Sequence, residues 1–208
     1  MAKVVKNKYK NLTVFTDGSM VIKNVTLSYP HLSEPYAKRE DDDTDAKFEA
    51  RKKYSLAAML SKDTHEETYD HLLDIIKSAS VQAKVKVAKK DFFISDGDDS
   101  AKEEYEGSWV VNAREKRKPT CRSSAGAVIS DEEVNDKFYA GCMVNVLVKP
   151  WVQNNPYGKK VNLNLQAVQF VADGERIGGG PVDDEGAFES YYDDSGDDGA
   201  FDDDDDEI

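Results

Sequence analysis

The sequence has little cysteine, little histidine and no long apolar run. Its 208 residues include two cysteines and three histidines, and Cys121 and Cys142 do not have the spacing of a metal site. No apolar run approaches the ~20 residues that a membrane-spanning helix needs, so we expect no membrane partner. The N-terminus does not resemble a signal sequence. A reducing cytoplasm is therefore the expected location.

Motifs for catalysis are absent as well. The sequence contains no P-loop, no Gly-x-Ser-x-Gly elbow and no His-Glu-x-x-His pair. The triplet Gly178-Gly179-Gly180 opens no predicted helix, so it would be a poor phosphate cradle. A metal-dependent nuclease would hold paired carboxylates on strands, whereas here the paired acids lie in predicted loops and at the C-terminus. We therefore predict a protein that is not an enzyme and holds no cofactor or metal, with a nuclease as the least favoured alternative.

Basic residues are missing from the C-terminal end. Of the 41 acidic residues, fourteen lie in residues 181–208, which contain no Lys or Arg; this leaves 27 acidic against 28 basic residues in residues 1–180. The net charge of −13 is therefore almost entirely a property of residues 181–208, here named the acidic tail. Low hydrophobicity and like charge cannot offset the entropy of ordering. The sequence predicts a disordered acidic tail after a single domain over residues 1–180.

The body of the chain has the pattern of β strands. Leu12–Thr16 and Met20–Leu27 flank a turn at Asp17-Gly18 and are rich in Val, Ile, Thr and Phe, and Tyr29-Pro30 ends the second run. A slip in the alternation after Ala167 predicts a β-bulge. The further predicted strands are Tyr54–Leu60, Trp109–Arg114, Val144–Val152 and Val161–Val171.

One helix and three loops are predicted between these strands. Thr64 and Glu67 have the spacing of a capping box at a helix start. An apolar stripe then follows at helical spacing: Tyr69, Leu72, Leu73 and Ile76. Polar composition predicts loops over residues 31–47, 96–106 and 153–160. The fold class is therefore mainly β with one or two helices, an OB-fold β-barrel, in which the helix at 64–79 has an unusual place between the second and third strands.

Basic and aromatic residues alternate in several segments, which suits single-stranded nucleic acid, because cations contact phosphates while flat rings stack on bases. Trp109 shares a strand face with Val111 and Ala113, so we expect it in the core. Trp151 shares its face with Asn145 and Lys149, so we expect it to be exposed. The predicted nucleic-acid-binding residues are Lys23, Arg114, Lys116, Arg117, Lys118, Arg122, Lys149, Trp151, Tyr157, Lys159 and Lys160. The lysines from Lys3 to Lys10 either assist binding or mark a solvated terminus.

Several motifs occur in the order found in a known family. They are Val25–Leu32 (VTLSYPHL), Tyr105–Ala113 (YEGSWVVNA), Tyr139–Cys142 (YAGC), Asn154–Gly158 (NNPYG) and Gly174–Gly179 (GERIGG). On these residues the chain resembles a tailed-phage family of single-stranded DNA-binding proteins, long a domain of unknown function. The resemblance implies an OB-fold that coats single-stranded DNA with little sequence preference during phage DNA replication, recombination and repair, in the cytoplasm of the infected host.

The acidic tail is similar to the tails of bacterial and other phage single-stranded DNA-binding proteins. This resemblance implies that it binds replication proteins such as a DNA polymerase or a helicase. Bacterial tails end in an aromatic residue, whereas this one ends in Ile208. The predicted partner-binding residues are Phe201, Asp202, Asp203, Asp204, Asp205, Asp206, Glu207 and Ile208. We also expect the tail to compete with DNA for a cationic groove on the body.

An alternative function belongs to a different class. The chain would then be an interaction protein or DNA mimic whose acidic tail holds a basic partner, with no nucleic-acid groove of its own. Binding of a single-stranded oligonucleotide by residues 1–180 separates this alternative from a DNA-binding body.

Overall fold

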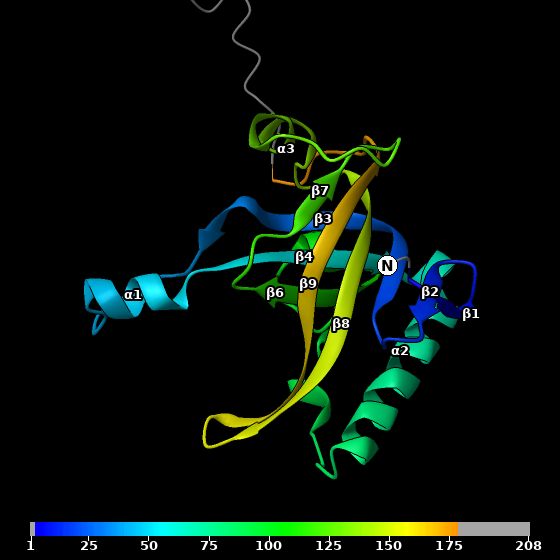
Figure 1. The fold of residues 1–208 in the computed structure, drawn as a ribbon, viewed down its shortest axis with the longest axis vertical. Coiled ribbons are helices and arrows are strands. Elements are labelled where there is room, and N and C mark those ends of the chain that lie inside the picture. Colours follow the sequence, from blue (N-terminus) through cyan, green and yellow to red (C-terminus); the bar gives the residue numbers. More distant parts are fainter. Residues whose placement is uncertain (1–2, 179–208) are drawn as a thin grey trace, which may run out of the picture.

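A nine-stranded sheet carries the fold in the computed structural model, which describes residues 3–178 (Figure 1). The main path of the sheet runs β5-β6-β4-β3-β8-β9-β7, and β2 pairs with both β1 and β3. The strands are β1 (Val5–Lys8), β2 (Leu12–Phe15), β3 (Met20–Tyr36), β4 (Lys53–Ser61), β5 (Ile94–Asp96), β6 (Ser108–Glu115), β7 (Thr120–Arg122), β8 (Met143–Asn155) and β9 (Gly158–Ala172).

The sheet curls into a barrel around one apolar core. Strand β3 pairs with β4 on one side and β8 on the other, and β6 lies against β9, so the two arms of the sheet meet. Alternate residues of β8, from Val144 to Val148, are at most 1% exposed, as are Leu163 and Leu165 of β9. This alternation is what a pleated strand with one buried face requires. The predicted mainly β barrel is confirmed, and residues 3–178 contain three α-helices rather than one or two.

Strand β3 is longer than predicted. The sequence places a strand end at Tyr29-Pro30, and this is wrong, because β3 continues to Tyr36. Its pairing with β4 shifts register between Ser28 and His31, and Tyr29 adopts a positive φ of 45°. Pro30 has no backbone N–H to donate to a neighbouring strand. A sheet tolerates such a residue at an irregularity of this kind, so the strand bends instead of ending.

The hairpin between β8 and β9 is also longer than predicted. Residues 153–160 do not form a loop, because pairing continues to Asn155 and Gly158 and leaves Pro156 and Tyr157 as the turn. Gly158 has φ 126°, which glycine adopts without strain. The predicted bulge is confirmed: Leu147 pairs with Ala167 while Val148 pairs with Leu165.

A short helix occupies part of the predicted loop 31–47. Helix α1 (Asp45–Arg51) begins after Thr44, whose side chain accepts the N–H of Lys47, and none of its residues is buried. It projects from the side of the barrel between β3 and β4 (Figure 1). We name residues 37–52 the α1 arm.

Helix α2 (Lys62–Gln82) lies between β4 and β6, where the sequence places a helix. Its Leu72 and Ile76 are fully buried, and Tyr69 stacks on Trp109 with ring centroids 4.1 Å apart, so Trp109 packs on the core as expected. The predicted capping box is wrong: the helix begins at Lys62, and the Thr64 hydroxyl bonds the ring of His65 instead.

The remaining helices are short. Helix α3 (Asp131–Lys137) begins with a capping box between Ser130 and Glu133. The 3-10 helices are η1 (Lys89–Asp91) and η2 (Glu103–Tyr105), and η2 lies within the predicted loop 96–106. None of the helices in residues 3–178 is both long and apolar enough to cross a membrane. The acidic tail, with its predicted partner-binding residues, lies outside the described residues.

Candidate nucleic-acid interface

A groove runs across one face of the barrel. It consists of two hollows of about 640 and 470 Å³ that share Lys53, Arg114, Lys160 and Asn162, so they form one continuous surface. The α1 arm forms one wall through Lys38, Glu40 and Arg51, while the β8–β9 hairpin forms the other. We name this surface the groove.

Exposed aromatic rings gather in the groove. Among residues 3–178 the exposed large aromatic side chains are Tyr29, Tyr36, Trp151 and Tyr157, with 49%, 54%, 42% and 88% of their surface accessible. All four line the groove, although they come from three separate parts of the chain. His31 also lines it and stacks on Tyr36 at 4.4 Å between ring centroids. Rings that stay exposed in a concave surface are available for stacking on a flat ligand.

Tyr29 is held in one orientation. Its backbone is in the left-handed region, which costs a bulky residue about 1–3 kcal/mol unless its surroundings hold it there. The ammonium of Lys102 lies 3.3 Å from the ring centroid, and the Tyr29 hydroxyl donates to Glu104 Oε1 at 3.0 Å. The ring of Tyr105 approaches edge-on at 6.4 Å. These contacts preorganise the ring in the wall of the groove.

The groove carries an excess of positive charge. Eight cationic side chains line it against three carboxylates, those of Glu40, Asp91 and Glu115. Burial lowers the pKa of the Lys53 ammonium, and the nearby charges of Arg114 and Lys116 lower it further. Like charges held together in this way are stabilised by a bound anion. The cations are Lys38, Arg51, Lys53, Lys90, Lys102, Arg114, Lys116 and Lys160.

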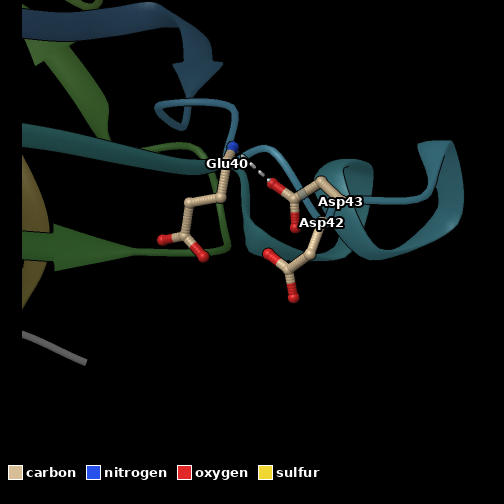
Figure 2. Close-up of side chains that lie close together, drawn as sticks. All are labelled: Glu40, Asp42 and Asp43. Carbon is tan, nitrogen blue, oxygen red and sulfur yellow. Dashed lines mark hydrogen bonds between the residues drawn. The ribbon is translucent and has the colours of Figure 1, made fainter.

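Three carboxylates lie close together on the α1 arm. Figure 2 shows Glu40, Asp42 and Asp43, whose nearest oxygens lie within 4.8 Å of one another. Arg51 pairs with Glu40 at 2.6 Å and with Asp43 at 2.7 Å, and Lys47 pairs with Asp42 at 2.7 Å. Because two side-chain cations already contact these carboxylates, we assign the cluster to holding the arm together rather than to a metal ion.

Comparison with known proteins identifies the family. Residues 18–200 match the family model of the single-stranded DNA-binding protein of Enterobacter phage Enc34. The chain belongs to this family. The resemblance inferred from the sequence motifs is therefore confirmed. A comparison with curated proteins found no match.

Solved structures support the assignment to the Enc34 family. The single-stranded DNA-binding protein from bacteriophage Enc34 in complex with single-stranded DNA is 35% identical, with a TM-score of 0.76 over 85% of this chain and 98% of that one. A second structure of that protein is 33% identical, with the same TM-score over 91% of this chain and 100% of that one. The gp2.5 protein of bacteriophage T7 is 14% identical, with a TM-score of 0.54 over 76% of this chain and 93% of that one, and shares the fold.

The groove of this Enc34-family member contains five of the residues predicted from its sequence. These are Arg114, Lys116, Trp151, Tyr157 and Lys160. They come from β6, the segment just after it, and the two strands and turn of the β8–β9 hairpin. Of the five residues predicted to form one wall, Trp151, Tyr157 and Lys160 line the groove, and their contact with DNA stays a prediction.

The other six predicted residues lie outside the groove. Lys149 lines a separate hollow beside α2, so it does not share a wall with Trp151. Lys159 alternates with Lys160 along β9 and faces the other side of the hairpin. Lys118 pairs with Asp131, and Arg122 donates to the carbonyl of Gly126. Lys23 and Arg117 line neither hollow of the groove.

Several groove residues were not predicted. Tyr29, His31 and Tyr36 come from the part of β3 that the sequence assigns to a strand end and a loop. Lys53 is the first residue of β4, and Lys102 immediately precedes η2. The signal for the tyrosines was present, because an aromatic ring in a polar segment has little to gain from burial. The same criterion identifies Tyr157, which is among the predicted residues. No local signal identifies Lys53 or Lys102.

Proposed function

We propose that this protein binds single-stranded DNA in the groove, with little sequence preference and without enzymatic activity. The observation that carries this proposal is that all four exposed large aromatic side chains of residues 3–178 line one groove together with eight cations. The family assignment supports it, as does the related phage Enc34 protein, whose structure is a complex with single-stranded DNA.

The groove can use two kinds of contact at once. Bases stack on Tyr29, Tyr36 and Trp151, each stack contributing about 1–3 kcal/mol, while Lys53 and Arg114 contact the phosphates. Stacking on side chains needs unstacked base faces, so a single strand is favoured over a duplex. Every base has such a face, so sequence preference is weak. Single strands coated in this way are protected during phage DNA replication, recombination and repair in the cytoplasm of the host.

The proposal is tested by fluorescence anisotropy with a labelled oligo-dT and the matching duplex. We expect the full chain to bind the single strand more tightly than the duplex, with affinity that falls steeply as salt rises. Tyr36→Ala should weaken binding. Tyr9→Ala is the matched control, because Tyr9 stacks on His71 in the separate hollow beside α2. Equal affinities for both variants would remove the groove assignment.

We propose two roles for the acidic tail. Its fourteen acidic residues are opposite in charge to the cation-rich groove, so it would compete with DNA for this surface. Once DNA is bound, the released tail would dock replication proteins such as a DNA polymerase or a helicase. Residues 1–180 should then bind oligo-dT more tightly than the full chain at low salt. Absence of binding by both would favour the alternative of an interaction protein or DNA mimic.

A further inference from the structure

The α1 arm is not anchored in the core. None of the residues of α1 is buried, and the arm joins the sheet where Tyr36 pairs with Lys53. Within the arm, the cations of Arg39 and Lys52 lie 5.1 and 4.9 Å from the ring centroid of Phe48. The ion pairs of the arm therefore decide where its groove-lining residues lie.

Arg51 is the centre of these ion pairs. Its Nη1 lies 2.6 Å from Glu40 Oε2 and its Nη2 lies 2.7 Å from Asp43 Oδ2, so each half of the guanidinium faces one carboxylate. Arg51 and Glu40 line the groove, whereas Asp43 does not. Of the two carboxylates that pair with Arg51, Glu40 is therefore on the groove side of the arm and Asp43 is behind it.

The two carboxylates differ in exposure. The side chain of Glu40 is 61% exposed, whereas that of Asp43 is fully buried. Asp43 also accepts the backbone N–H of Glu40 at 2.9 Å, a bond drawn in Figure 2, which fixes its carboxylate within the turn. An exposed carboxylate gives up an ion pair at little cost, because water solvates it at once. A buried carboxylate that loses its partner does not have this compensation.

We propose that Glu40 and Asp43 act on DNA binding in opposite directions through Arg51. Asp43 is a positioning residue that holds the guanidinium at the groove. Glu40 occupies the groove-facing half of the guanidinium in the free protein, and a phosphate replaces it when DNA binds. One phosphate oxygen can accept from Nη1 in the place of Glu40 Oε2 while Nη2 stays paired with Asp43, so the exchange keeps the geometry of the guanidinium. This inference rests on the proposed function.

The proposal predicts effects that net charge alone does not. Removing either negative charge makes the groove more positive, so simple electrostatics expects both neutral variants to bind DNA more tightly. In our proposal, Glu40→Gln tightens binding because no carboxylate competes for Arg51. Asp43→Asn weakens binding because Arg51 loses its buried carboxylate partner and keeps only the exposed Glu40 and the Lys38 carbonyl.

The experiment measures binding of oligo-dT by the full chain at several salt concentrations. Asp41→Asn is the matched control, since Asp41 is an exposed carboxylate on the same arm. Relative to this control, we expect Glu40→Gln to bind about three- to fivefold more tightly and Asp43→Asn about threefold more weakly. For Glu40→Gln, the slope of log affinity against log salt concentration should be steeper by about 0.7. In the wild-type chain DNA binding frees the Glu40 carboxylate, which takes up a salt cation, whereas the variant has no such carboxylate.

A second background isolates Arg51. In an Arg51→Gln chain, we expect Glu40→Gln and Asp43→Asn to change affinity no more than Asp41→Asn does, since both act through the guanidinium. Equal tightening by all three neutral variants, or effects that persist without Arg51, would overturn the inference while leaving the proposed function in place. Absence of oligo-dT binding by the wild-type chain would overturn both.

Discussion

Lys102 lies over the ring of Tyr29, with its Nζ 3.3 Å from the ring centroid. The same ammonium is 5.1 Å from the ring of Tyr105. One face of Tyr29 is therefore covered by a cation from a loop about seventy residues later in the chain, which leaves the rest of the ring to the groove. This contact ties the loop before β6 to the irregular part of β3.

We expect Lys102→Gln to weaken binding of oligo-dT, because the variant removes both a groove cation and the contact that holds Tyr29. The expected loss is about 1 kcal/mol in binding free energy. Lys77→Gln is the matched control, since Lys77 is an exposed lysine on α2 paired with Asp74. Anisotropy titrations of the two variants make the comparison, and equal affinities would show that Lys102 has no part in binding.

Truncation of the hairpin aromatics tests the second wall of the groove. We expect Trp151→Ala and Tyr157→Ala each to cost about 1–3 kcal/mol of binding free energy, the contribution of one base stack. Both side chains are exposed, so the free energy of unfolding should change by no more than about 0.5 kcal/mol. Titration with oligo-dT and thermal unfolding measure the two quantities. Unchanged affinity in both variants would contradict the assignment of this wall.

DNA affinity should depend on pH through His31. Burial lowers the pKa of His31 below its ordinary value of 6.5, so the ring is neutral at pH 7. As the pH falls below 6.5 through this lowered pKa, protonation adds a positive charge to the groove. We expect oligo-dT affinity to rise by about 0.5 kcal/mol over this range. His31→Gln should remove the rise, and a rise that persists in this variant would assign it to another group.

Stability should fall on acidification because of His65. Neutral His65 donates from Nε2 to the Lys23 carbonyl at 3.0 Å and accepts the Thr64 hydroxyl at Nδ1, and burial lowers its pKa. Below pH 6.5 the unfolded chain therefore binds a proton that the folded chain resists, so the free energy of unfolding decreases as pH falls towards the folded pKa. Denaturant unfolding at pH 7 and pH 5 should show this decrease. His65→Gln should show a smaller decrease than the wild-type chain, and an equal one would contradict the assignment.

Gly97 should be intolerant of any side chain. A Cβ at this position would overlap the backbone carbonyl oxygens of Tyr105 and Ser108, and backbone atoms cannot move aside as a flexible side chain can. We expect Gly97→Ala to lower the free energy of unfolding by about 1–3 kcal/mol. Ser100→Ala, at an exposed position of the same loop, should have little effect. Equal stability of the two variants in denaturant titrations would contradict the close packing of this loop.

The strands and the main helix could be predicted because their signals are local. The alternation of Val144, Val146 and Val148, and the stripe with Leu72 and Ile76, each follow from a segment that buries one face. The same reasoning fails where no face is buried. The β8–β9 hairpin is polar on both sides near its tip, so its alternation carries no signal and the sequence suggests a loop.

The β-rich body, the acidic tail and the basic and aromatic segments typical of a single-strand binder can all be inferred from the sequence. These are properties of neighbouring residues and of the whole composition. Which residues form the groove depends on the folded sheet, because strand pairing brings together residues from separate parts of the chain. These are Tyr29, Lys53, Lys102, Arg114 and Lys160. The folded sheet also separates Lys149 from Trp151, two residues apart, since the register and curvature of a sheet depend on long-range pairing that no local pattern encodes.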